Sequence, residues 1–136
     1  QKSGLPVWIV GTSRSTDTAT AMAINVHDPA IAGLVLTSSV VRYATPGAVP
    51  RQDLKASALP VLVYHHAKDA CKHCQASEAP YIIKGLSNAS IKKLMVVDGG
   101  ANPSGDECAG QHWHGFPNFE REAISQIAEW IKKPIN

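Results

Sequence analysis

The fold is decided by the stretch Pro6-Val-Trp-Ile-Val-Gly11-Thr12-Ser13-Arg14-Ser15-Thr16, in which an apolar run ends abruptly and a helical pattern begins at once. A strand–turn–helix of this kind places its central side chain at the carboxyl edge of a parallel sheet, above the helix N-terminus. Gly11 and Ser15 are small, as the close approach of strand and helix requires. The unpaired N–H groups of the helix N-terminus favour negative charge there. Ser13 is therefore a candidate nucleophile, and its alternative role is to cap the helix.

The rest of the chain repeats this alternation of strand and helix. Four short runs rich in Val, Ile and Leu lack polar alternation, as strands buried on both faces do: Leu5–Val10, Ile31–Thr37, Val61–Tyr64 and Leu94–Val97. Apolar residues at helical spacing fall between and after these runs, in residues 19–26, 79–86 and 119–131. The pattern predicts an α/β fold: a parallel sheet of about four strands, with helices on both faces.

Two of the later runs lead to residues whose chemistry complements a serine. Asp69 follows the Val61–Tyr64 run, and the long loop after the last run contains His112 and His114. All parallel strands present their carboxyl ends on one side of a sheet, so we expect Ser13, Asp69 and a histidine to meet there. An imidazole takes the proton of the serine, and a carboxylate orients that imidazole. Considered without the other two residues, Asp69 has two alternative roles: it caps a helix or forms an ion pair.

These features resemble the α/β-hydrolase family over essentially the whole chain, although they match only the second half of a family domain. The elbow is similar to the family's G-x-S-x-G motif, with Ser15 in place of the last glycine. His114 is preferred as base because His114-Gly-Phe leads into the last helix, where the family's base lies. The resemblance implies a serine hydrolase that uses Ser13, Asp69 and His114 on an ester or related carbonyl substrate, without a cofactor.

The same resemblance implies that residues 1–136 are the C-terminal part of one domain whose N-terminal half is absent. The backbone N–H of Arg14 is one expected oxyanion-hole donor, and the absent half carries the other. Losing one donor costs on the order of a hundredfold in rate, so we expect weak or no activity from this chain alone. The apolar Leu5–Val10 strand would lie at a sheet edge, where strands invite pairing. We expect it to bind the N-terminal fragment or a second copy of this chain.

Three cysteines, Cys71, Cys74 and Cys108, lie near the candidate acid and base. The resemblance favours a Cys71–Cys108 disulfide, because a Cys just after the acid and another before His-Gly-Phe look like the pattern of some secreted or periplasmic hydrolases. A disulfide implies an oxidising compartment. Two alternatives stay open: a redox pair in Cys71-Lys-His-Cys74, and a zinc site made of the three cysteines with His112.

Composition narrows the function classes further. Apolar residues make up 44% of the chain, and the formal net charge is +2. Basic residues are scattered without aromatic interleaving, so no nucleic-acid partner is expected. The longest apolar runs are too short to cross a bilayer, so no membrane partner is expected either. A non-catalytic fragment or interaction module that keeps the fold is the main alternative to an enzyme.

Overall fold

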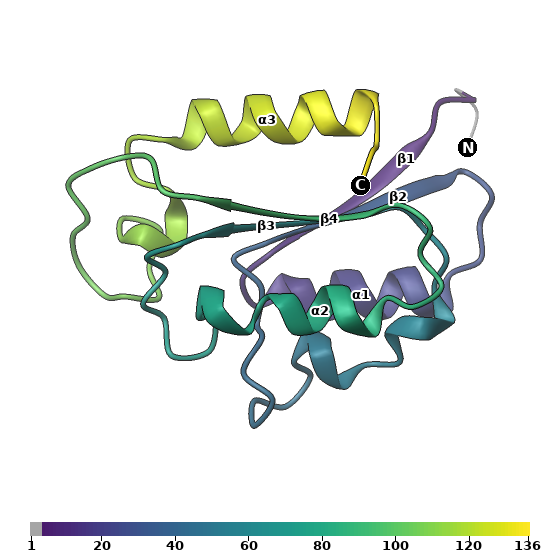
Figure 1. Cartoon of the computed structure of the whole chain (residues 1–136), viewed down its shortest axis with the longest axis horizontal. Helices are drawn as coiled ribbons and strands as arrows, with labels where there is room; N and C mark the ends of the chain where they lie inside the picture. Colours follow the sequence, from purple (N-terminus) through teal and green to yellow (C-terminus); the bar gives the residue numbers. More distant parts are fainter. Residues whose placement is uncertain (1–3) are drawn as a thin grey trace.

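The computed structural model describes residues 4–136, which form one four-stranded parallel sheet flanked by helices (Figure 1). The strands lie in the order β1-β2-β3-β4. This arrangement confirms the predicted α/β fold. The main elements, in chain order, are β1 (Val7–Thr12), α1 (Ser15–Asn25), β2 (Ile31–Thr37), β3 (Val61–His66), α2 (Pro80–Gly85), β4 (Lys92–Val97) and α3 (Glu120–Lys132).

Helices cover both faces of the sheet, as the sequence predicts. Figure 1 shows α1 and α2 on one face and α3 on the other. Successive strand residues point to opposite faces. Leu36 and Val63 therefore pack in the cluster that includes α1 and α2, whereas Leu62 and Tyr64 pack in the cluster that includes α3. Both faces of the central strands are buried, which explains why their sequences show no polar alternation.

Some strand boundaries differ from the sequence predictions, in each case by two residues. β2 spans Ile31–Thr37 as predicted, but β1 runs from Val7 to Thr12 rather than from Leu5 to Val10. β3 extends through His66, and β4 begins at Lys92. The register explains both extensions, because His66 pairs with Val97 and Val61 pairs with Lys92. Backbone pairing continues through polar residues that an apolar-run criterion leaves out.

The topology sets all four carboxyl strand ends along one edge of the sheet. The turn with Ser13 follows β1 directly, and the loop with Asp69 (the acid loop) follows β3. The long loop with His114 (the base loop) follows β4 and leads to α3. Within residues 4–136, no helix has the length and apolarity needed to span a membrane.

Candidate active site

The turn between β1 and α1 holds Ser13 in a strained backbone conformation. Its φ of 54° lies in the left-handed region, which costs free energy for a residue with a side chain. Hydrogen bonds fix this conformation: the Ser13 N–H donates to the Thr37 carbonyl (3.0 Å), and the Thr16 N–H donates to the Ser13 carbonyl (3.0 Å). A Cβ on Gly11 would lie 2.7 Å from the Ala19 Cβ. The glycine before the turn is therefore a packing requirement.

Ser15, which stands where the G-x-S-x-G motif has its last glycine, closes the turn with its own side chain. Its hydroxyl accepts a hydrogen bond from the Thr12 N–H (2.8 Å). The same hydroxyl donates to the Thr12 carbonyl (2.8 Å). The extra hydroxymethyl group therefore satisfies both backbone groups of the residue before Ser13, and the elbow geometry is kept without a second glycine.

Asp69 lies after β3 and is buried, with 6% of its surface exposed. Its Oδ1 accepts a hydrogen bond from the Cys71 N–H (3.0 Å). Its Oδ2 lies 2.9 Å from the His114 Nδ1. The neighbouring Lys68 forms its ion pair with Asp98 (3.0 Å) and not with Asp69.

The pKa of Asp69 reflects two opposing causes. Burial raises it, but hydrogen bonds from His114, His65 and the Cys71 N–H, together with the charge interaction with His114, hold the pKa below the ordinary value of 3.8. Asp69 is therefore a carboxylate at neutral pH, as an acceptor for an imidazole N–H must be.

His114 bridges the acid and the candidate nucleophile. Its Nδ1 faces Asp69, and its Nε2 lies 2.8 Å from the Ser13 Oγ. The residue is buried, with 4% of its surface exposed. The Ser38 hydroxyl donates to the His114 carbonyl (2.6 Å) and so anchors the base loop to the end of β2. His112, the second candidate base, makes no hydrogen bond to either partner within the described part of the chain.

Arg14 precedes the first residue of α1, and its backbone N–H lies directly beside Ser13. Among residues 4–136 this N–H has no hydrogen-bond acceptor. It therefore remains free to bind an oxygen that develops negative charge next to the Ser13 Oγ, and the helix dipole favours such a charge.

The cysteines form the predicted pair. A disulfide joins Cys71 to Cys108, and Cys74 is a buried free thiol. This bond rules out the Cys71–Cys74 disulfide. It also removes two thiolates from the predicted zinc set, because a disulfide sulfur is not the thiolate that zinc binds. The ligand atoms of Cys71, Cys74 and His114 do lie within 4.8 Å of one another, but one of these sulfurs is the disulfide sulfur of Cys71.

Cys74 lies against the candidate nucleophile, a contact that no residue pattern in the sequence predicts. Burial and the charge of Asp69 raise the pKa of the Cys74 thiol to about 12, although its interaction with the Ser13 side chain opposes the shift. At neutral pH the sulfur therefore carries its proton and adds no charge to the site.

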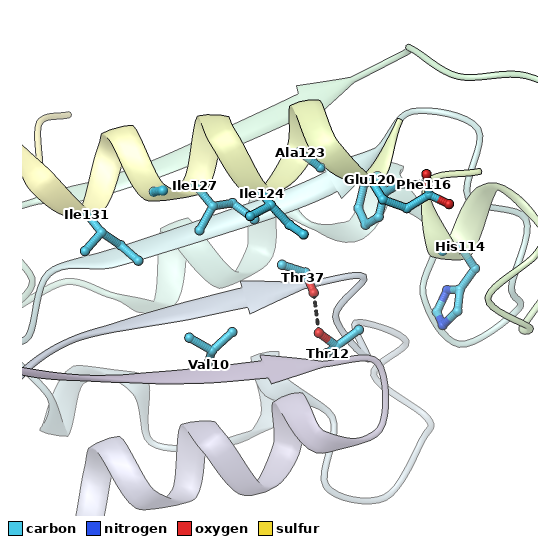
Figure 2. A pocket seen from close by; sticks show the side chains of 12 residues that line it. Val10, Thr12, Thr37, His114, Phe116, Glu120, Ala123, Ile124, Ile127 and Ile131 are labelled. Carbon is cyan, nitrogen blue, oxygen red and sulfur yellow. Dashed lines mark hydrogen bonds between the residues drawn. The ribbon is translucent and has the colours of Figure 1, made fainter. Parts of the chain in front are cut away.

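Two hollows flank the Ser13–His114 pair. The smaller, of about 220 Å³, includes Ser13, Arg14, Thr45, His73 and the disulfide in its lining. The larger is a groove of about 440 Å³. Figure 2 shows it between α3 and the β1 and β2 strands, with His114 at one end. Its lining is mostly apolar: Val10, Thr12, Thr37, His114, Gly115, Phe116, Glu120, Ala123, Ile124, Ile127, Ala128 and Ile131.

Comparisons with known proteins add no assignment. No protein-family model matches the chain. A search of the curated proteins found no significant match.

Proposed function

We propose that this chain is a serine hydrolase that transfers an acyl group from an ester or related carbonyl substrate to water. The observation that carries the proposal is the position of the His114 ring. Its two nitrogens lie 2.8 Å from the Ser13 Oγ and 2.9 Å from the Asp69 Oδ2. A hydroxyl activated by an oriented imidazole is the arrangement that acyl transfer requires.

The proposed reaction begins when the Ser13 Oγ attacks the carbonyl carbon and passes its proton to the His114 Nε2. Asp69 stabilises the resulting imidazolium through its hydrogen bond to Nδ1. The carbonyl oxygen, now negatively charged, accepts a hydrogen bond from the Arg14 N–H. Collapse of this intermediate breaks the ester bond, and His114 returns the proton to the leaving alcohol. Water then attacks the acyl-Ser13 ester by the same steps and releases the acid, so no cofactor takes part.

A serine-directed fluorophosphonate probe tests this proposal. We expect a covalent adduct on Ser13, located by peptide mass spectrometry, and no adduct in Ser13→Ala. Ser39→Ala is the matched control, because Ser39 also lies just beyond the end of a strand, here β2, and its buried hydroxyl has no hydrogen-bond partner among residues 4–136. That variant should keep the adduct. A folded wild-type protein that takes no label at high probe concentration, even after a fragment that carries the N-terminal half of the domain is added, would support the non-catalytic alternative.

We further propose that the outer edge of β1 binds a strand of another polypeptide. β1 is an edge strand of the sheet, and Val10 within this strand is 57% exposed. The groove continues this open edge to α3, where Ile124 is 67% exposed. Exposed apolar surface beside a strand edge favours pairing. A strand pairing parallel to β1 would end beside Ser13, and the loop after it could supply the second oxyanion donor.

The proposed location is the periplasm or the extracellular space. The Cys71–Cys108 disulfide supports it, because such bonds persist mainly in oxidising compartments.

A further inference from the structure

A second imidazole, that of His65, lies beside Asp69, the proposed acid of the Ser13–His114–Asp69 set. His65, near the end of β3, is fully buried. Its Nε2 lies 2.6 Å from the Cys74 carbonyl oxygen and 3.4 Å from the Asp69 Oδ2. A carbonyl oxygen only accepts hydrogen bonds, so this short contact assigns the ring proton to Nε2. The Nε2–H of His65 therefore donates to the Cys74 carbonyl, and the Asp69 Oδ2 lies 3.4 Å from the same nitrogen.

The other ring nitrogen indicates that His65 is neutral. Its Nδ1 is buried and has no hydrogen-bond partner in the described chain. A proton on this atom would be a buried donor without an acceptor, which costs free energy. His65 consequently presents a neutral ring with one N–H, and that N–H faces Asp69.

Both imidazoles meet the same carboxylate oxygen. His114 contacts the Asp69 Oδ2 at 2.9 Å and His65 contacts it at 3.4 Å, while the Oδ1 accepts the Cys71 N–H. His65 belongs to β3, Cys71 to the loop that also carries Asp69, and His114 to the long loop between β4 and α3. They leave the carboxylate little freedom to rotate. The neighbouring His66 is equally buried, but it bonds to the Gly99 carbonyl (2.8 Å).

We propose that His65 is a positioning residue, which acts through Asp69 by holding the Oδ2 toward His114. Its effect on catalysis rests on the hydrolase function proposed above, whereas its effect on Asp69 does not. A residue that only fills space in the core would be replaceable by a ring of similar size. A positioning residue needs its N–H.

The test replaces His65 by Phe, which keeps a ring and removes the donor. We expect the pKa of Asp69, followed by carboxyl carbon NMR, to rise, because the charged form loses a hydrogen bond. We expect the rate of Ser13 labelling by the fluorophosphonate to fall about tenfold, which corresponds to one lost hydrogen bond to a charged group. His65→Gln, whose amide N–H reaches a similar place, should restore most of both values.

His66→Phe is the matched control, since His66 lies on the same strand at the same burial and keeps its stacking on Trp113 with a Phe ring. It should leave the pKa of Asp69 unchanged. An unchanged Asp69 pKa in His65→Phe, or an equal shift in both Phe variants, overturns the proposal. If the wild type takes no label, the hydrolase function fails, but the Asp69 pKa still decides this inference.

A measurement on the unaltered protein covers the case in which His65→Phe does not fold. Nitrogen NMR of the wild type should show His65 as the neutral Nε2–H tautomer, with a proton protected from solvent exchange. A neutral ring protonated at Nδ1, or a charged ring, overturns the proposal without any substitution.

Discussion

At the scale of single residues, the charge of Asp69 couples folding to pH. Its pKa in the folded chain lies below the ordinary value of 3.8, so the fold favours the carboxylate. The resulting stability is fully present above that ordinary value, and it is lost as the pH falls from there through the folded pKa. We expect the free energy of unfolding in urea to fall more steeply below pH 4 in the wild type than in Asp69→Asn. Parallel curves for the two proteins would contradict this account.

The thiol of Cys74 gives a second prediction at this scale. Its pKa of about 12 leaves almost no thiolate at pH 8, and only the thiolate reacts with alkylating agents. We expect iodoacetamide to leave the native protein unmodified at pH 8 and to modify one thiol per chain after unfolding without reduction. Cys74→Ala should show no reactive thiol in either state. Rapid alkylation of the native wild type would show that the site is open to the reagent.

The sequence predicts some of these residues and not others, for a physical reason. Ser13, Asp69 and His114 each come after an apolar strand, and parallel topology alone brings the ends of such strands together. The role of His65 depends on a contact with the Cys74 carbonyl. Where a loop carbonyl lies is set by tertiary packing, which the pattern of residue types does not encode.

At the scale of the element, the junction of β1 and α1 depends on a glycine. A Cβ at position 11 would lie 2.7 Å from both the Ala19 Cβ and the Ser15 carbonyl oxygen, so Gly11→Ala should lower the free energy of unfolding by about 1–3 kcal/mol. Gly110→Ala is the control, because a Cβ there meets nothing within 4 Å. Urea denaturation measures both variants. Equal stability of the two would show that the junction relaxes freely.

The disulfide acts on the loops that carry the acid and the base. Cys71 and Cys108 are 37 residues apart, and closing a loop of that size stabilises a fold by roughly 4 kcal/mol on the chain-entropy model. We expect the double variant Cys71→Ala/Cys108→Ala to lose a comparable free energy of unfolding and to label more slowly at Ser13. A loss well below that value would mean that hydrogen bonds such as Ser38 to the His114 carbonyl hold the loops by themselves.

The same scale shows what limits prediction of the fold. β2 is predicted to the residue, because its ends coincide with the ends of its apolar run. β3 continues through His65 and His66, which are polar and yet fully buried. Hydrogen bonds to the carbonyls of Cys74 and Gly99 compensate this burial. These carbonyls belong to the loops that follow β3 and β4, so the apolar pattern ends before the strand does.

At the scale of the whole molecule, the open edge of β1 predicts association. Light scattering at rising protein concentration should detect complexes larger than the 14.5 kDa monomer, or a complex with a chain that supplies the complementary strand. Val10→Lys should weaken either complex, because a lysine at an edge strand disfavours pairing. Val96→Lys is the control, since Val96 is 49% exposed on β4 at the opposite edge. A monomer that stays unchanged, with or without such a chain, contradicts the proposal.

The hydrogen bond between Ser13 and His114 joins positions 101 residues apart. A nascent chain that has emerged only as far as β4 therefore contains the serine and the carboxylate but not the imidazole, and so does a chain clipped in the loop that follows. Any reactivity of Ser13 that depends on His114 begins only when the segment that carries His114 has been synthesised and has docked. A covalent tag on Ser13 would thus report only the molecules in which this segment is in place.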